Sequence, residues 1–395
     1  MADSDLEDFR ADARAWLTAN FPPSLAGASD GAAEAAMAGE TPSGDAALWR
    51  RRMGEKGWGA PTWPAIWGGG GLTAAKAGVL AREMAALGAY NPIVGMGTSM
   101  FGPTLLEYGT EDQKRRHIPP IVRGELRWCQ GYSEPGAGSD LASLQTRCED
   151  AGDHWKINGQ KVWTSGAQYA DWCFCLVRTD TARKHEGISF VLIDMHQDGV
   201  ETRPIRLIAG SSPFCETFFT DARVEKNDMV GPVNGGWAIG KRLLQHERSG
   251  QGGGRMLGVG APLPDLAREY VSVNGAGAIA DPDLRAKVAI NAADARAHAL
   301  TSRRAAAEAR GNQNPGAVTS IMKNSSTRIG QEKAELTLEI MGRQGLGWEG
   351  EDFAEGELAA VRGWLTGKAW TIFGGSEEIQ NNIIAKRILG LPDPT

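Results

Sequence analysis

The stretch on which the interpretation of this chain depends is Gln130-Gly131-Tyr132-Ser133-Glu134-Pro135-Gly136-Ala137-Gly138-Ser139-Asp140. Pro135 fixes one backbone angle and lacks an N–H, while Gly136 and Gly138 permit positive φ and a close approach of the backbone to another molecule. A loop of this kind can present successive N–H groups to an anion. Gly-Ala-Gly-Ser is also common in surface turns, so these four residues alone favour an ordinary turn.

A second stretch with a distinctive composition follows shortly afterwards: Asn158-Gly159-Gln160-Lys161-Val162-Trp163-Thr164-Ser165-Gly166-Ala167-Gln168-Tyr169-Ala170-Asp171. Together the two stretches resemble the flavin-binding signatures of the acyl-CoA dehydrogenases, in the same order and at a similar spacing. The resemblance covers nearly the whole chain. It implies an FAD-containing oxidoreductase of lipid metabolism that performs the α,β-desaturation step of a β-oxidation. In this family a carboxylate removes the α-proton of an acyl-CoA thioester and the β-carbon gives a hydride to the flavin N5.

Composition narrows the remaining classes of protein. The chain has 395 residues, of which 42% are hydrophobic, and a net charge of −6, which argues against a broad nucleic-acid surface. Its acidic start lacks a signal-peptide pattern and its apolar runs are too short to span a bilayer, so a cytoplasmic location is expected. Five scattered cysteines without a Cys-x-x-Cys pair predict neither disulfides nor a metal site. Cys173 and Cys175 are expected as buried thiols on one face of a strand.

The patterns along the chain predict an α+β protein with three parts. Residues 1–125 read as an N-terminal helical domain, 126–232 as a middle antiparallel β-domain (barrel or sandwich), and 233–395 as a C-terminal helical domain. The family resemblance implies the same organisation, with a four-helix bundle as the C-terminal domain. Helices are expected near 45–56, 73–88, 102–108, 111–122, 236–262, 282–310, 314–342, 356–368 and 376–389. Strands are expected at 172–177, 188–193 and 217–219, and Asn158-Gly159 predicts the turn of a hairpin over 155–163.

The resemblance also assigns residues to the cofactor site. Ser133 and the backbone from Gln130 to Tyr132 should bond the edge of the isoalloxazine ring, and Trp163 should pack against it. Further residues assigned to the cofactor are Gly138 and Ser139 (near the pyrophosphate or the thioester arm), Ser165 (near N5 and O4), Thr164, Ser376 and Glu378. By composition alone Trp163 would be a core residue, as one of thirteen tryptophans. Ser376 equally fits the N-cap of the last helix, and Glu377 and Glu378 fit its first turn.

The catalytic base is where this chain departs from the common family pattern. Gly374 stands where many members carry a catalytic Glu, so only its backbone N–H could act, as a donor to the thioester carbonyl. Other members carry the base in a Glu-Arg pair on another helix, which corresponds here to Glu247 and Arg248. We therefore predict Glu247 as the base, with Gln245 and Arg248 (and Ser139) contacting the substrate. The alternative is a solvated Glu-Arg pair on a helix face. Glu377 and Glu378 are then the fallback candidates for the base, although they fit better as charges at a helix N-terminus.

A run of glycines follows the predicted base, Gly250-Gln251-Gly252-Gly253-Gly254. Glycine weakens a helix by about 1 kcal/mol relative to alanine and leaves space beside the base. The run is compatible with a wide pocket for a bulky, branched or steroid-type acyl group, which relatives acting on steroid side chains use. It is equally compatible with a bent helix that has no bearing on the substrate.

A second departure concerns partners. Homotetrameric members place an Arg from an adjacent subunit on the flavin pyrophosphate, and here Val271 stands at that position. A hetero-oligomer with a related subunit would supply the missing Arg, whereas in a homo-oligomer Arg268 or Arg343 would replace it. Electron-transfer flavoprotein is the expected electron acceptor. An oxidase that uses O₂ and a non-catalytic subunit of a paired dehydrogenase remain alternatives, and the acyl group stays open.

Overall fold

The computed structural model describes residues 2–29, 31–32, 35, 39–251, 261–309 and 318–392. The chain forms two compact units. The first comprises Met1–Ile205 and Ser212–His246, and the second comprises Arg206–Ser211 and Glu247–Thr395. Within the described part, no helix combines the length and the apolar character needed to cross a membrane. The boundaries of the three expected domains, after residues 125 and 232, stay a prediction.

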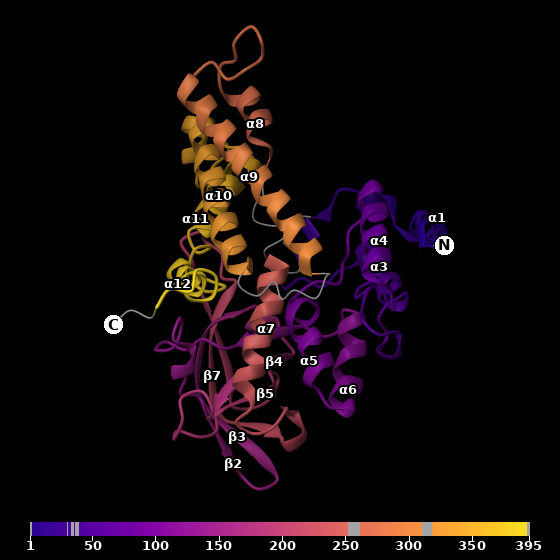
Figure 1. Cartoon of the computed structure of the whole chain (residues 1–395), viewed down its shortest axis with the longest axis vertical. Helices are drawn as coiled ribbons and strands as arrows, with labels where there is room; N and C mark the ends of the chain where they lie inside the picture. The colour runs from indigo at the N-terminus through magenta and orange to yellow at the C-terminus, as the bar shows by residue number, and fades with distance from the viewer. Residues whose placement is uncertain are drawn as a thin grey trace. The chain divides into compact units, whose positions relative to one another are not determined.

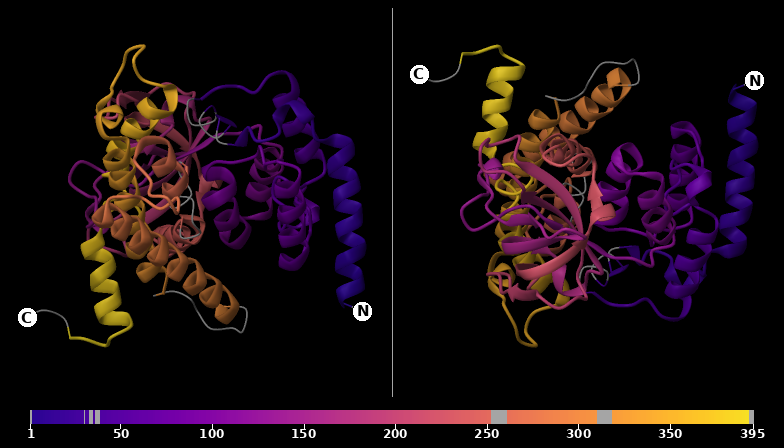
Figure 2. Two further views of the ribbon diagram at one scale, coloured as in Figure 1. Left: turned by 90° about the horizontal axis from the view of Figure 1, so that it is seen from above. Right: turned by 90° about the horizontal axis from the view of Figure 1, so that it is seen from below.

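The first unit begins with the predicted helical domain. Its helices are α1 (Ala2–Asn20), α3 (Gly44–Glu55), α4 (Ala74–Ala86), α5 (Gly102–Tyr108) and α6 (Glu111–Val122). α1 packs against α4 (Figures 1 and 2), around a core that includes Trp49 and Trp58. α6 begins with a capping box in which Thr110 and Gln113 exchange hydrogen bonds, as expected where a helix starts after a polar residue.

The middle of the first unit is an eight-stranded sheet in the order β6-β7-β3-β2-β4-β5-β8, with β1 paired to β4. β1 pairs with β4 in parallel and β2 makes one parallel contact with it, whereas the remaining pairings are antiparallel. The expected β-domain is thus confirmed, with a local parallel element that short-strand patterns do not reveal. The strands are β1 (Trp128–Gly131), β2 (Arg147–Asp150), β3 (His154–Ser165), β4 (Trp172–Arg178), β5 (Ile188–Asp194), β6 (Val200–Ile205), β7 (Phe214–Glu225) and β8 (Met229–Val230).

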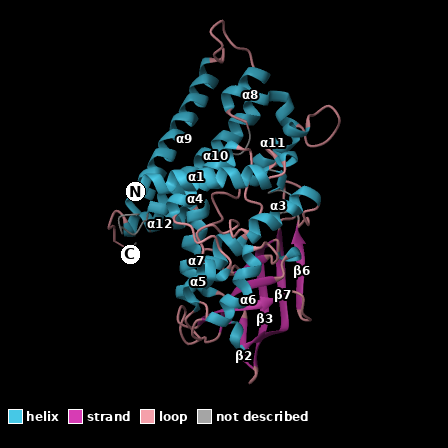
Figure 3. Ribbon diagram, turned by 90° about the vertical axis from the view of Figure 1, so that its right-hand side faces the viewer, coloured by secondary structure: helices cyan, strands magenta, loops and turns pink. Residues whose placement is uncertain are grey.

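The two faces of this sheet pack into different layers. Phe174 and Leu176 of β4 belong to a core shared with α5, α6 and α7 (Gly236–Gln251), helices that lie beside the strands in Figure 3. Cys173, Cys175 and Val177 alternate with them and enter a second core formed by other strands. All of β4 after Trp172 is buried, which explains why the strand is almost continuously apolar, and the expected burial of both thiols is confirmed.

The hairpin expected at Asn158-Gly159 is wrong. β3 runs without a turn from His154 to Ser165, and the pair with β7 shifts its register between Ile157 and Gly159. A Cβ on Gly159 would lie 2.6 Å from the Thr146 hydroxyl oxygen, so the residue before β2 approaches too closely for any side chain. Glycine is therefore required here by a β-bulge and a close contact rather than by a reverse turn.

The second unit is helical, as expected of the C-terminal part. It contains α8 (Leu263–Tyr270), α9 (Pro282–Ala309), α10 (Val318–Met341), α11 (Glu355–Gly367) and α12 (Glu377–Arg387), the orange-to-yellow helices of Figures 1 and 2. α10 packs against the other four. The pattern analysis did not anticipate α8, and α7 is described as far as Gln251 of the expected 236–262. Ser376 caps α12, its hydroxyl accepting from the Ile379 N–H at 3.4 Å, as predicted.

Candidate functional site

The loop from Glu134 to Gly138 is a tight, closed turn with an open outer side. The backbone of Glu134 and that of Ala137 exchange two hydrogen bonds of 3.0 Å each. Neither Gly136 nor Gly138 has a positive φ, so these glycines are not required by a left-handed backbone conformation. A Cβ on either would meet nothing within 4 Å, and Ser139 next to them is exposed. The glycines thus leave free space along the backbone, as a site for close approach of a ligand requires.

Trp163 lies at a β-bulge that turns its ring out of the sheet. Lys161 pairs with Thr217 and Thr164 with Cys215, so β3 holds one more residue than β7 between these pairs. The extra residue lets Lys161 and Thr164 both point inward, with both side chains fully buried. Trp163 adopts φ 59° and is 55% exposed, its ring standing at 87° to that of Phe214. The structure thus rejects the core interpretation of Trp163.

The first signature lies beside this bulge. The Val162 N–H donates to the Ser133 carbonyl at 2.9 Å, which joins β3 directly to the residue after Tyr132. Tyr132 is buried, Ser133 and Ser165 are half-buried, and Gln130 lies in β1. Two polar atoms in these segments, Nε2 of Gln130 and Oγ1 of Thr164, are buried and find no hydrogen-bond partner among the described residues. The two signature segments are therefore in direct contact at Ser133 and Val162.

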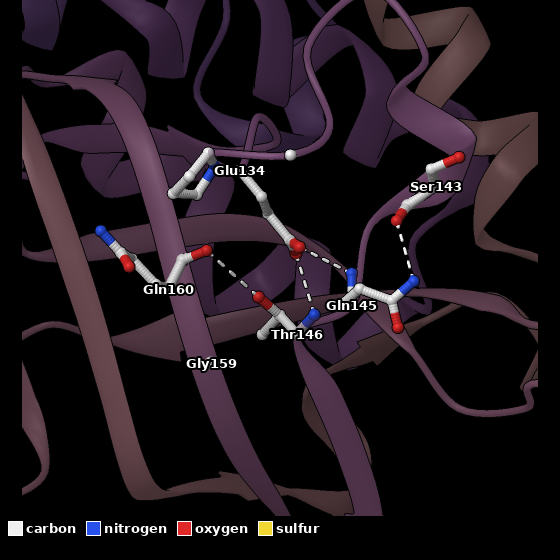
Figure 4. A pocket seen from close by; sticks show the side chains of 8 residues that line it. Glu134, Ser143, Gln145, Thr146, Gly159 and Gln160 are labelled. Carbon is white, nitrogen blue, oxygen red and sulfur yellow. Dashed lines mark hydrogen bonds between the residues drawn. The ribbon is translucent and has the colours of Figure 1, made fainter.

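Two charged residues of the signatures, to which the pattern analysis gave no role, form the buried centre of this region. Lys161 donates from Nζ to Oε1 of Glu134 at 2.7 Å, and Glu134 also accepts from the N–H groups of Gln145 (2.6 Å) and Thr146 (2.9 Å). Figure 4 shows the Glu134 carboxylate at the wall of a cavity of about 540 Å³. Lys161, a charged residue within an otherwise strand-like stretch, was the feature of the sequence that could have indicated a buried ion pair.

In the second unit the predicted site residues lie at the turn before α12. Gly374 and Gly375 have φ of 69° and 91°, and the amide of the buried Gln380 donates to their carbonyls at 2.9 and 3.4 Å. The Gly374 N–H has no acceptor in the part of the chain that the structure describes. Glu378 is exposed, and a hydrogen bond with Ser376 lowers the pKa of its carboxyl. Ser376 and Glu378 thus act in the first turn of the helix.

The remaining predicted residues are placed less completely. Gln245 is exposed on α7 and accepts from the Arg242 guanidinium at 2.9 Å. Glu247 and Arg248 belong to α7, but their side chains lie outside the described residues. Arg268 pairs with Asp265 on α8. Arg343 is exposed in a short 3₁₀ helix (Gly342–Leu346) and makes no ion pair with any described residue.

Comparison with known proteins identifies the family. The profile of the acyl-CoA dehydrogenase N-terminal domain matches residues 3–125, that of the middle domain 129–222, and that of the C-terminal domain 234–389. The chain is 36% identical to acyl-CoA dehydrogenase IpdE1 of Mycobacterium tuberculosis, with 98% of each chain covered.

Solved structures agree with this assignment. The Tcur3481-Tcur3483 steroid ACAD has a TM-score of 0.78 and 29% identity over 99% of this chain and 98% of that chain. The ChsE4-ChsE5 complex of M. tuberculosis has a TM-score of 0.76 and 30% identity over the same shares, 99% and 98%. The chain therefore belongs to the acyl-CoA dehydrogenase family, whose members use FAD.

Proposed function

We propose that this chain binds FAD and oxidises the acyl group of an acyl-CoA thioester to its α,β-unsaturated form. The observation that carries the proposal is the outward indole of Trp163, held in a left-handed backbone conformation next to Val162, whose N–H bonds the Ser133 carbonyl. A tryptophan at positive φ and 55% exposed stores strain and leaves apolar surface uncovered. A planar aromatic ligand packed on the ring would offset both costs.

The polar groups nearby suit a flavin. The buried Nε2 of Gln130 and Oγ1 of Thr164 lack partners among the described residues, whereas an isoalloxazine ring carries both acceptors and a donor at its edge. Ser133 and Ser165 add half-buried hydroxyls from the same two segments. We assign Gln130, Tyr132, Ser133, Trp163, Thr164 and Ser165 to the ring, and Gly138 and Ser139 to the pyrophosphate or thioester arm.

The chemistry requires a base and a donor to the thioester carbonyl. Bound FAD would accept the hydride from the β-carbon. Glu247 is assigned as the base that takes the α-proton, because Gly374 has no carboxylate at the usual position. The Gly374 N–H, which has no described acceptor, is available to hold the carbonyl oxygen as negative charge develops on it. Gln245 and Arg248 are assigned to substrate contacts, and Ser376 and Glu378 to the cofactor end of the α12 turn.

A bulky acyl group is the proposed substrate class. The Tcur3481-Tcur3483 relative is described as a steroid ACAD, and the glycine run that follows Glu247 removes side chains next to the proposed base. We expect turnover of a branched or polycyclic acyl-CoA to exceed that of butyryl- or octanoyl-CoA by at least about tenfold in kcat/KM. Equal or better turnover of the straight-chain substrates would contradict this substrate class.

The oligomer is proposed to contain a second, related subunit. Val271 stands where homotetrameric members place their Arg, and two of the similar solved structures carry paired names, ChsE4-ChsE5 and Tcur3481-Tcur3483. A second candidate function is that of a non-catalytic subunit in such a pair, because Gly374 has no carboxylate at the usual position of the base. Electron-transfer flavoprotein is the proposed acceptor, and fast reoxidation of the reduced enzyme in air would indicate an oxidase instead.

The experiment is purification of the chain alone and together with a related subunit, followed by visible spectroscopy. Flavin bands with about one FAD per chain in the isolated protein would favour a homo-oligomer in which Arg268 or Arg343 replaces the missing cation. A colourless chain that gains FAD only with a partner supports the hetero-oligomer. Absence of FAD from both preparations would contradict the proposed function.

A further inference from the structure

A buried ion pair joins the two segments assigned to the flavin. Lys161 of β3 is fully buried and Glu134 is 8% exposed. The Lys161 ammonium donates to the Glu134 carboxylate at 2.7 Å and to the backbone carbonyl of Tyr132 at 3.1 Å. Lys161, which belongs to the second signature, therefore bonds two residues of the first signature, Tyr132 and Glu134.

The Glu134 carboxylate anchors a third segment as well. It accepts from the N–H groups of Gln145 and Thr146, the residues that lead into β2 (Figure 4). Burial raises the pKa of this carboxyl, but the Lys161 charge and the hydrogen bonds from Lys161, Thr146 and Gln145 outweigh that effect and hold the pKa below its ordinary value. Glu134 is thus ionised at neutral pH, and its carboxylate accepts hydrogen bonds from Lys161, Gln145 and Thr146.

The burial of these two charges is by itself weak evidence of a contribution to stability. Taking a lysine and a glutamate out of water is costly, and apolar side chains of similar volume often stabilise a core as well or better. The β-bulge after Lys161 turns this residue and Thr164 inward together, whereas simple alternation would put them on opposite faces. What the ion pair adds is a fixed geometry, since it ties the Tyr132 carbonyl to a point two residues before Trp163.

We infer that the Lys161–Glu134 ion pair positions the two flavin-binding segments relative to each other, so that Lys161 and Glu134 are positioning residues of the cofactor site. The inference rests on the proposed FAD binding. Without the pair, the segment Tyr132–Glu134 would keep its backbone bond from Val162 but would lose its side-chain anchors to β3 and to the two residues before β2. The ring-binding groups on Ser133 and Trp163 would then no longer be held at one separation, and FAD binding would weaken.

The test measures FAD affinity and protein stability separately. The double variant Lys161→Met/Glu134→Leu replaces the pair by apolar side chains, and Glu134→Gln is the milder second variant. A matched control is Arg116→Met/Asp228→Leu, which removes a 2.8 Å pair in the same unit whose carboxylate is also buried but which touches neither signature. The FAD dissociation constant of the apo-protein is read from flavin fluorescence, and its unfolding temperature from tryptophan fluorescence. If FAD is retained only in a complex, the complex is used.

We expect the Lys161→Met/Glu134→Leu variant to bind FAD at least about tenfold more weakly, the scale of a lost charged hydrogen bond, with the control within about twofold of wild type. If the double variant does not fold, Glu134→Gln is expected to show a weakening of at least about threefold at an apo-protein unfolding temperature no lower than that of the control. FAD affinity within about twofold of wild type in the folded variant would overturn the inference. Equal weakening in the control would also overturn it, because that result indicates a general loss of structure. A wild-type protein without FAD affinity would refute the proposed cofactor itself.

Discussion

The imidazole of His117 should make the stability of this protein depend on pH between about 4 and 6.5. His117 lies in α6, is 3% exposed, and stands edge-to-face against Trp128 and Trp172 at centroid distances of 5.1 and 4.9 Å. Neither ring nitrogen has a hydrogen-bond partner among the described residues. Burial, with a smaller effect of the Arg116 charge, lowers the pKa of this imidazole to about 4.

The sign and size of the effect follow from this pKa. The unfolded chain binds a proton at His117 below pH 6.5, whereas the folded chain does so only near pH 4. The stabilisation is therefore complete above pH 6.5 and is lost as the pH falls towards 4. Each pH unit in this window costs about 1.4 kcal/mol, so between pH 6.5 and pH 5 the free energy of unfolding should fall by about 2 kcal/mol through this residue.

The assay compares urea unfolding of wild type and of His117→Leu at several pH values, followed by tryptophan fluorescence. Leucine has a similar volume and no proton to bind, so the variant should lose about 2 kcal/mol less than wild type between pH 6.5 and pH 5. His196→Gln is the control, because the His196 side chain is 69% exposed. Wild-type and His117→Leu profiles that run parallel within about 0.5 kcal/mol would refute the reasoning.

Three further substitutions test other parts of the structure. Trp163→Ala should weaken FAD binding by about tenfold or more, while Trp163→Phe should retain most of the affinity. Equal FAD dissociation constants for the two variants in fluorescence titrations would contradict the packing role. Gly375→Ala should lower stability by about 1–3 kcal/mol, because its φ is 91° and a Cβ would lie 2.4 Å from the Gln380 amide nitrogen; Gly138→Ala, with open space, should stay within about 0.5 kcal/mol in the same melts. Arg178→Met should lower the free energy of unfolding in denaturant by about 3 kcal/mol, since this buried guanidinium donates to four backbone carbonyls. A loss below about 1 kcal/mol would show that water takes over the hydrogen bonds of the guanidinium.

Local patterns identified most of the elements of this fold. The N-cap at Ser376 and the helices over 102–108 and 111–122 follow from residues close together in the sequence, and each is present. The Asn158-Gly159 pair shows the limit of such patterns. Its glycine is needed because Thr146, the residue before β2, approaches it, which no local pattern records. α8 was missed for a related reason, since Pro262 and Pro264 at its start resemble a loop.

The candidate site was predictable where family resemblance supplied roles, and less so elsewhere. Trp163 was expected against a ring, but its bulge and left-handed backbone became visible only once β3 was paired with β7. The Lys161–Glu134 pair spans 27 positions, and nothing in either segment alone indicates that the two side chains meet. A contact at this distance depends on how the loop after β1 packs against β3, so it belongs to the tertiary structure rather than to the sequence pattern.

The most direct test of the proposed function is flavin reduction by substrate in the absence of oxygen, compared between wild type and Glu247→Gln. Glu351→Gln serves as the matched control, because Glu351 is exposed and none of the proposed roles falls on it. The account predicts that Glu247→Gln, loaded with FAD, bleaches the flavin at least about a hundredfold more slowly, the scale of a lost general base, while Glu351→Gln stays close to wild type. Reduction of Glu247→Gln within about threefold of the wild-type rate would contradict the account.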